Sequence, residues 1–251
     1  ESYDRKDMEL PYGQTELIER LLSINKNIII VNMSGAPVEM KKWADQASTI
    51  IQYWYSGAEG GLALAEVLFG AVNPSGKLPT TFPRSLEDTP VHYFREYPGD
   101  DTVHYNEGIF VGYRYYDTYD VEPQFCFGHG LSYTTFEYGH LNAKASKSET
   151  KDQISVCISL TVTNMGSMSG AEAVQLYVSV PKSSVPRPLK ELKGFKKIYL
   201  EPGETKQISF ELNTADFCYY SNECSEWVYE DGNFDILIGS SSRDIRLRTH
   251  L

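Results

Sequence analysis

The stretch WYSGAEGGLALAEVLFG, residues 54–70, decides the fold of the first part of the chain, because a strand ends there and a helix begins. Residues 48–54 form a short apolar run rich in β-branched and aromatic residues, which predicts a buried strand. Downstream, apolar residues recur at the spacing of one helical face, and Gly70 stands where a glycine commonly ends a helix. Glu59 lies at the junction. Open α/β sheets bind ligands beyond the carboxyl ends of their strands, so Glu59 is the leading catalytic candidate.

Glu59 also has a purely structural interpretation. An acidic residue in the first turn of a helix is stabilised by the helix dipole, whatever the protein does. A general acid must in addition hold its proton near neutral pH, which requires burial or a second carboxylate close by. The neighbouring sequence does not supply that partner, so the catalytic interpretation depends on another part of the protein.

The composition is that of an ordinary globular chain. Its 251 residues, 41% hydrophobic and 13% aromatic, suffice for one large domain or two smaller ones, and we expect two. The net charge of -11 and the pI near 5.0 argue against a nucleic-acid partner. No apolar run is long enough to cross a bilayer, so we expect no membrane partner. The chain begins with Glu1 and no secretory signal, which indicates a fragment or a processed piece of a longer protein.

The four cysteines, Cys126, Cys157, Cys218 and Cys224, lack the spacing of a zinc site, so we expect no metal and no cofactor. Cys218 and Cys224 flank a plausible loop that a disulfide would close in an oxidising compartment. Four buried free thiols in a cytoplasmic protein explain the same pattern equally well. The sequence therefore leaves the localisation open between cytoplasm, periplasm and secretion.

We assign residues 1–84 to the carboxyl-terminal part of an α/β sandwich domain. Helices and strands alternate there, which is typical of a mostly parallel sheet. The strands are too few for a free-standing doubly wound domain, so we expect residues before Glu1 to supply the others. The expected elements are helices at 14–25, 38–47 and after Glu59, and strands at 28–32, 48–54 and 77–82.

Residues 85–132 form a connector dense in proline, glycine, aspartate and aromatic residues, with one helix-like patch at 108–116. Its aromatic side chains could stack on sugar rings, but we favour packing against the surface that the connector crosses. We interpret Asp100 and Asp101 as turn residues and Glu107 as part of the packing. These aromatic residues include Tyr93, Phe94, Tyr97, Tyr105, Phe110 and Tyr115.

Residues 133–251 are predicted to be all-β. Alternating strands separated by turn sequences indicate a fibronectin type III-like, or immunoglobulin-like, β-sandwich. The fold class is therefore α/β followed by all-β, with a partial α/β sandwich layer before the β-sandwich. The expected strands are 154–162, 173–180, 192–200 and 206–212, with a last pair at 227–229 and 234–238.

Six segments in this order resemble the carboxyl-terminal half of glycoside hydrolase family 3 β-glucosidases. They are SGAPVE at 34–39, WYSGAEGG at 54–61, AEVLFGAVNPSGKLPTTFP at 65–83, EGIFVGYRYYD at 107–117, FGHGLSYTTF at 127–136 and PRPLKELKGF at 186–195. The resemblance implies a barrel domain, then an α/β sandwich domain, then a fibronectin type III-like domain. It places the nucleophilic aspartate on the barrel and the acid/base glutamate on an α/β loop, which corresponds to Glu59.

The resemblance implies a retaining exo-β-glycosidase that hydrolyses terminal non-reducing β-D-glucosyl residues. Such an enzyme needs two carboxyl groups about 5 Å apart, so Glu59 is expected to be inactive without the barrel. The implied partners are a β-glucoside or oligosaccharide substrate, an amino-terminal barrel polypeptide and, as a further option, a second copy in a homodimer. A non-catalytic carbohydrate-binding or scaffold module is the alternative function. His129 has the near-neutral pKa of a base, but between two glycines it favours a structural hydrogen-bonding role.

Overall fold

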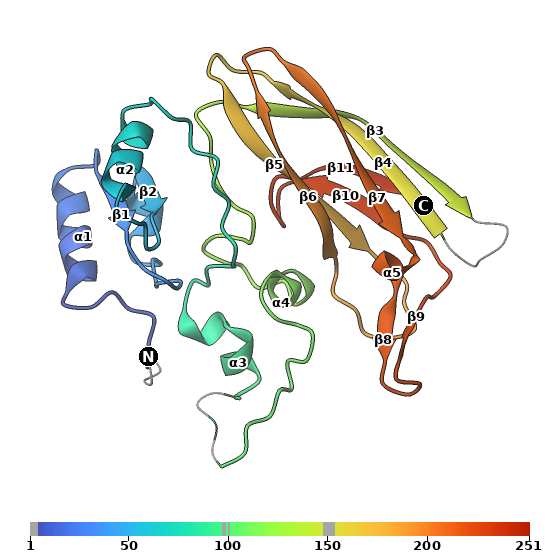
Figure 1. The fold of residues 1–251 in the computed structure, drawn as a ribbon. Helices are drawn as coiled ribbons and strands as arrows, with labels where there is room; N and C mark the ends of the chain where they lie inside the picture. The colour runs from blue at the N-terminus through green and yellow to red at the C-terminus, as the bar shows by residue number, and fades with distance from the viewer. Residues whose placement is uncertain (1–4, 97–98, 100, 148–153) are drawn as a thin grey trace. The chain divides into compact units, whose positions relative to one another are not determined.

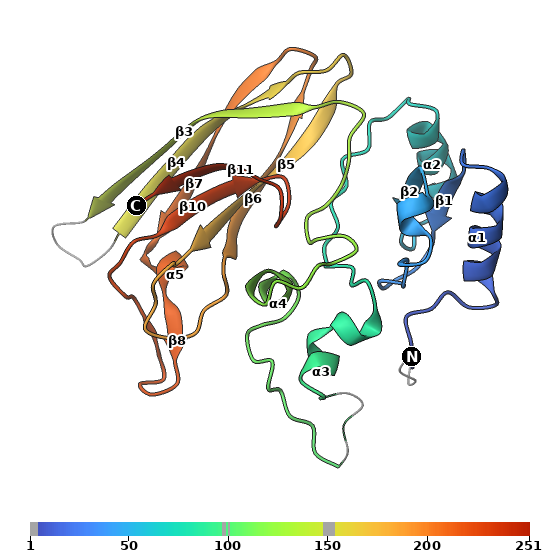
Figure 2. The ribbon, with the colours of Figure 1, turned by 180° about the vertical axis from the view of Figure 1, so that it is seen from behind.

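The computed structural model describes residues 5–96, 99, 101–147 and 154–251. The chain divides into two compact units. The first comprises Glu1–Phe69 and Thr80–Phe127, and the second comprises Gly70–Pro79 and Gly128–Leu251. The first unit contains helices and a parallel strand pair, and the second is built almost entirely of strands, which confirms the predicted fold class (Figures 1 and 2).

A two-stranded parallel sheet lies at the centre of the α/β part of the first unit. Its strands pair from Ile29 opposite Thr49 to Asn32 opposite Gln52, so the two carboxyl ends lie side by side. The helices expected at 14–25 and after Glu59 and the strands expected at 28–32 and 48–54 are confirmed, the strands with closer limits. The elements are α1 Gln14–Ile24, β1 Ile29–Asn32, the 3-10 helix Ala44–Gln46, β2 Thr49–Gln52 and α2 Gly60–Leu68.

The helix expected at 38–47 is wrong except for its last turn. Val38 and Met40 are both buried although they are two residues apart, which is the period of extended chain and not of a helix. The backbone N–H of Glu39 donates a hydrogen bond to the carbonyl of Met8, 2.8 Å away, which holds the extended conformation. The segment turns at residues 41–43, ending at the buried Trp43, and the short 3-10 helix follows.

The connector contains short helices rather than regular strands. The strand expected at 77–82 is wrong, because only Phe82 forms a bridge, with Phe125. The helix-like patch at 108–116 is helical only in its second half. The elements of this segment are the 3-10 helix Leu86–Asp88 and the helices α3 Pro90–Tyr93 and α4 Tyr113–Thr118.

The second unit is a sandwich of a four-stranded sheet, in the order β11-β10-β5-β6, and a three-stranded sheet, in the order β3-β4-β7. All pairs within these sheets are antiparallel. The elements are β3 Phe136–Lys147, β4 Ile154–Asn164, β5 Gly170–Ser179, β6 Glu191–Leu200, β7 Thr205–Asn213, α5 Thr214–Phe217, β8 Tyr219–Ser221, β9 Glu226–Val228, β10 Asp235–Gly239 and β11 Ile245–His250.

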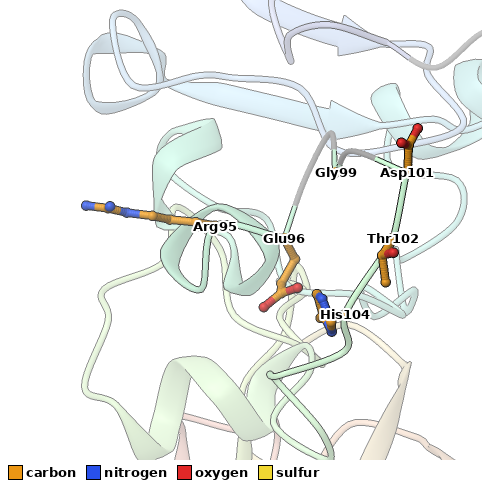
Figure 3. Close-up of a pocket in the computed structure, with 6 residues that line it drawn as sticks. All are labelled: Arg95, Glu96, Gly99, Asp101, Thr102 and His104. Carbon is orange, nitrogen blue, oxygen red and sulfur yellow. The ribbon is translucent and has the colours of Figure 1, made fainter.

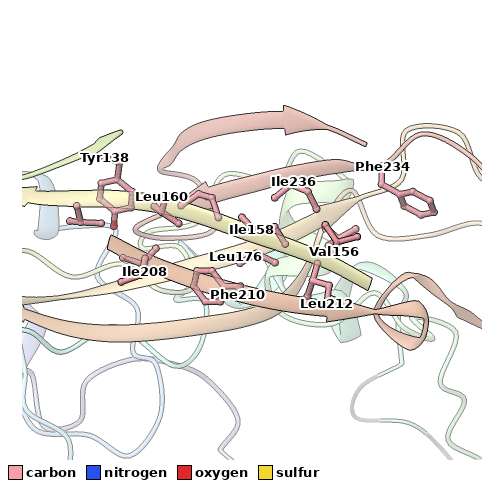
Figure 4. Packing of buried hydrophobic residues seen from close by; sticks show 14 of the residues in the cluster. Tyr138, Val156, Ile158, Leu160, Leu176, Ile208, Phe210, Leu212, Phe234 and Ile236 are labelled. Carbon is pink, nitrogen blue, oxygen red and sulfur yellow. The ribbon is translucent and has the colours of Figure 1, made fainter. Parts of the chain in front are cut away.

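The core of this unit follows from the alternation in β4. Val156, Ile158, Leu160 and Val162 point to one side and are almost completely buried, which is the pattern of a strand with one face toward a core. Apolar residues of β5 and β10 meet them from the facing sheet, and apolar residues of β3 and β7 flank them on the same sheet (Figure 4). Labelled examples are Tyr138, Leu176, Ile208, Phe210, Leu212, Phe234 and Ile236.

Three features of the sandwich differ from the expectation. The strands β3 and β11 were not predicted, although β11 alternates Ile245 and Leu247 with arginines. The predicted pairing of 227–229 with 234–238 is wrong, because β9 pairs with β8 while β10 pairs with β5 and β11. The pair β8–β9 therefore forms a small sheet of its own.

Candidate functional site

The carboxyl ends of β1 and β2 carry a polar network. The side-chain amide of Asn32 donates to Oγ of Ser34, at 2.9 Å, and to Oε1 of Gln52, at 2.6 Å. Nε2 of Gln52 donates in turn to the carbonyl of Ser34, at 3.1 Å. Asn32 is buried, so this network fixes how the two loops leave the sheet.

The turn between β2 and α2 is tightly constrained by close packing. Trp54 has a φ of 58°, a conformation that non-glycine residues rarely adopt, and its ring packs edge-on against Phe82 at 6.0 Å. A Cβ atom at Gly60 would lie 2.2 Å from the hydroxyl oxygens of Tyr53 and Ser56. Only glycine fits at this position. The close approach of the turn to Gly60 therefore fixes the backbone next to Glu59.

Glu59 lies at the last position before α2, as the sequence predicted, with φ -86° and ψ 6°. Its side chain does not cap the helix, is exposed, and forms no hydrogen bond or ion pair with any residue that the structure describes. The carboxylate is therefore available to a ligand. The burial that a general acid requires is not supplied by this part of the protein.

The connector buries two further carboxyl groups that the sequence did not single out as a pair. Glu107 is buried, as expected for packing, and its Oε2 has no hydrogen-bond partner among the described residues. Glu96 is also buried and accepts a hydrogen bond from the side chain of Asn106. The predicted turn residue Asp100 and the aromatic Tyr97 lie outside the described residues.

A small polar cavity of about 340 Å³ opens beside Glu96 (Figure 3). In the close-up, the carboxylate of Glu96 points toward the imidazole of His104. The other lining residues are Arg95, Gly99, Asp101 and Thr102. Among the described residues, no three histidine, cysteine or acidic side chains come close enough to hold a metal ion, here or elsewhere.

The connector aromatics pack mainly on one another. Tyr115 is buried and its ring lies 5.9 Å from that of Tyr93, 6.3 Å from that of Phe94 and 5.2 Å from that of Tyr119. Burial raises the pKa of Tyr115 above its usual value. Tyr93 and Tyr105 nevertheless remain exposed, and packing of these rings against the surface that the connector crosses stays a prediction.

His129 belongs to the second unit and its backbone carbonyl accepts a hydrogen bond from the N–H of Leu78, at 2.8 Å. Burial, together with the positive charge of Lys77, lowers the pKa of His129 below its ordinary value. The imidazole is therefore neutral at neutral pH, and its structural role stays a prediction.

The cysteines form no disulfide in the structure, so Cys218 and Cys224 are not joined. The alternative of four buried thiols is wrong as well, because Cys157 and Cys224 are exposed. Within the described ranges, no helix has both the length and the apolarity needed to span a bilayer.

Comparison with known proteins gives the same family along the chain. Residues 1–113 match the profile of the glycosyl hydrolase family 3 C-terminal domain, and residues 172–242 match that of a fibronectin type III-like domain. Thermostable β-glucosidase B of Acetivibrio thermocellus is 49% identical over 99% of this chain and 32% of its own length. β-Glucosidase BoGH3A of Bacteroides ovatus is 47% identical over 98% of this chain and 33% of its own.

Solved structures agree. The β-glucosidase of Kluyveromyces marxianus superposes with a TM-score of 0.93 at 42% identity, covering 99% of this chain and 30% of that protein. The GH3 β-glucosidase of Bifidobacterium adolescentis superposes with a TM-score of 0.93 at 41% identity, covering 100% of this chain and 36% of that protein. The chain thus spans about a third of the length of the relatives that it matches. It belongs to glycosyl hydrolase family 3, of which it carries the C-terminal domain and the fibronectin type III-like domain.

Proposed function

We propose that this chain is the carboxyl-terminal part of a retaining exo-acting β-glucosidase, which hydrolyses terminal non-reducing β-D-glucosyl residues. The observation that carries the proposal is the 49% identity to a β-glucosidase along 99% of the chain. The K. marxianus β-glucosidase has been solved in complex with glucose, and that structure matches 99% of this chain with a TM-score of 0.92. The similarity is therefore not confined to one domain.

The partner required by this proposal is an amino-terminal barrel polypeptide that carries the nucleophilic aspartate. Because the relatives are about three times as long as the chain, they have room for such a domain. The chain alone is then expected to be inactive. A homodimer stays a prediction.

Within the complete enzyme, we assign the acid/base role to Glu59. In the first step the barrel aspartate attacks the anomeric carbon while the acid protonates the departing glycosidic oxygen. In the second step the same residue, now a carboxylate, removes a proton from the water that releases glucose. The position of Glu59 beyond β2 and its exposed, unpaired carboxylate support this assignment.

The test is a scan of glutamate-to-glutamine variants in the complete polypeptide, because Glu59 is one of ten glutamates in the segment that matches the catalytic family. A β-glucoside with a poor leaving group needs the acid, whereas one with a good leaving group does not. We expect only Glu59→Gln to lose about 10²–10⁴-fold on the poor substrate while it still releases the good leaving group rapidly in the first step. Its second step, which lacks the base, should be slow and partly rescued by azide. The scan covers Glu1, Glu9, Glu16, Glu19, Glu39, Glu59, Glu66, Glu87, Glu96 and Glu107.

The scan separates the enzyme proposal from the residue assignment. If another glutamate gives this leaving-group signature and Glu59→Gln does not, the role belongs to that glutamate and our assignment is wrong. If the complete polypeptide hydrolyses no β-glucoside, the proposed function itself fails.

A further inference from the structure

The hairpin formed by β8 and β9 presents two aromatic rings to solvent. Tyr220 and Trp227 lie directly opposite each other across the strand pair, and they are 51% and 69% exposed. Their centroids are 5.7 Å apart with planes at 75°, an edge-to-face arrangement. In such a pair at least one ring keeps faces that its neighbour does not cover. The hairpin extends beyond the strands of the two larger sheets of its unit (Figures 1 and 2).

The base of the hairpin is firmly held, so these rings are presented by a rigid support. Phe217, just before β8, is buried against Phe234, with ring centroids 4.8 Å apart. Nη1 of Arg187 donates a hydrogen bond to the carbonyl of Phe217, at 3.0 Å. Just after β9, Tyr229 stacks on Phe234, with ring centroids 6.1 Å apart. A preorganised pair loses little conformational entropy when a ligand binds.

We propose that Tyr220 and Trp227 form a binding site for a neutral β-linked oligosaccharide. The face of an aromatic ring is electrically negative and its surface apolar, which suits the C–H-lined face of a glucose ring. The choice of a β-glucan as ligand rests on the proposed function. The site would hold the polymer whose ends the complete enzyme cleaves.

Charge and area argue against other partners. Residues 219–228 contain two glutamates and neither lysine nor arginine, which disfavours nucleic acid, anionic membranes and acidic polysaccharides. The exposed parts of the two rings amount to roughly 250 Å², given the usual area of aromatic side chains. A stable protein interface needs about 800 Å² on each side. The patch suits two or three sugar rings better than a protein.

The test uses the 251-residue chain and cellopentaose in NMR titrations. The three tryptophans give three indole N–H signals, and we expect the signal of Trp227 to shift while those of Trp43 and Trp54 stay. Tyr220→Ala keeps this reporter and should weaken binding about tenfold. Phe195→Ala is the matched control, because Phe195 is also 69% exposed in the same unit, and it should bind like the parent. Trp227→Ala should abolish retardation in native gels containing hydroxyethyl cellulose.

The proposal is overturned if cellopentaose leaves the Trp227 signal unmoved, if Phe195→Ala weakens binding as much as Tyr220→Ala does, or if the hairpin binds anionic vesicles instead. Circular dichroism of each variant shows whether a loss comes from unfolding. The readout is binding, not hydrolysis. A hairpin that binds sugar, together with a complete polypeptide that hydrolyses no β-glucoside, would refute the proposed function alone. An active complete enzyme whose hairpin does not bind sugar would refute only the hairpin site.

Discussion

Replacing Lys77 by methionine is expected to destabilise the second unit, because it leaves a buried carboxylate without its cation. Glu172 is 4% exposed, accepts a hydrogen bond from the hydroxyl of Tyr138 at 2.8 Å, and lies 3.5 Å from Nζ of Lys77. Nζ also donates to the carbonyl of Gly130, at 3.0 Å. Burial and the neighbouring Glu172 raise the pKa of Tyr138 far above its usual value, so that its hydroxyl remains a donor.

The expected size follows from this geometry. Removing one partner of a buried ion pair usually costs about 3–5 kcal/mol. The pair here is long, and the guanidinium of Arg246, which lies over the ring of Tyr138 at 5.3 Å, partly replaces the lost charge. We therefore expect a loss of about 2–3 kcal/mol in the free energy of unfolding, which lowers the melting temperature by roughly 10 °C.

A double-mutant cycle makes the reasoning refutable. Glu172→Gln keeps an acceptor for Tyr138 but removes the charge, so it should cost only about 1 kcal/mol. The double variant Lys77→Met/Glu172→Gln should then be more stable than Lys77→Met alone, with a coupling of about 1.5 kcal/mol. Because the two units need not unfold together, urea unfolding is best followed through methyl NMR signals of the sandwich core, such as that of Ile158. If the losses of the two single variants simply add in the double variant, Lys77→Met does not leave an uncompensated buried charge on Glu172, and the reasoning is refuted.

Three further changes test the junction, the core and the pH response. Gly60→Ala should lower the free energy of unfolding by about 1–3 kcal/mol, because its Cβ meets two hydroxyls. In Gly61→Ala the new Cβ meets nothing within 4 Å, so this variant should be neutral or more stable in urea titrations. Equal effects of the two substitutions would contradict the close packing at Gly60. Ile158→Ala, at a completely buried position, should cost about 2–5 kcal/mol, and a loss below 1 kcal/mol would show a looser core. Because the folded state lowers the pKa of His129, the unfolded chain binds its proton first, so stability should be full above pH 6.5 and fall as the pH drops below it. His129→Gln should flatten this decline, and an unchanged pH profile would contradict the burial argument.

The strands with strong periodicity could be predicted, and those without it could not. β4 alternates apolar and polar residues along its whole length, so its limits followed from the sequence within two residues. β3 contains Gly139, His140 with a φ of 52°, and a shift in register between Gly139 and Asn142. A bulged edge strand of this kind does not keep a period of two, so its pattern is lost.

The error at residues 38–47 has a different cause. Val38, Met40 and Trp43 can be read as apolar positions of a helix or of an extended chain, because short segments do not distinguish the two periods. The extended form is held by a hydrogen bond to Met8, a residue 31 positions from Glu39. Such a tertiary contact is invisible to local pattern analysis.

At the candidate site, the sequence predicted where Glu59 lies but not what surrounds it. The strand–turn–helix pattern placed the residue at the start of α2 within one position. Burial, by contrast, depends on which segments come together in space. The same limit applies to Glu96, whose burial no spacing rule could indicate, and to the Tyr220–Trp227 pair, which was hidden by a wrong strand pairing.

The segment Gly70–Pro79 shows why the unit limits could not be found from composition. Its proline and glycine content is that of a linker, yet Asn73 donates to the carbonyl of Ser169, at 3.0 Å, and accepts from Oγ of Ser132 and the N–H of Tyr133. Four residues on, Lys77 pairs with the buried Glu172. These contacts span 53 to 96 positions in the sequence, and they make the linker-like segment Gly70–Pro79 part of the β-sandwich. Polar groups of this segment complete buried hydrogen bonds of the sandwich. The segment therefore stabilises that unit and does not merely lie near it.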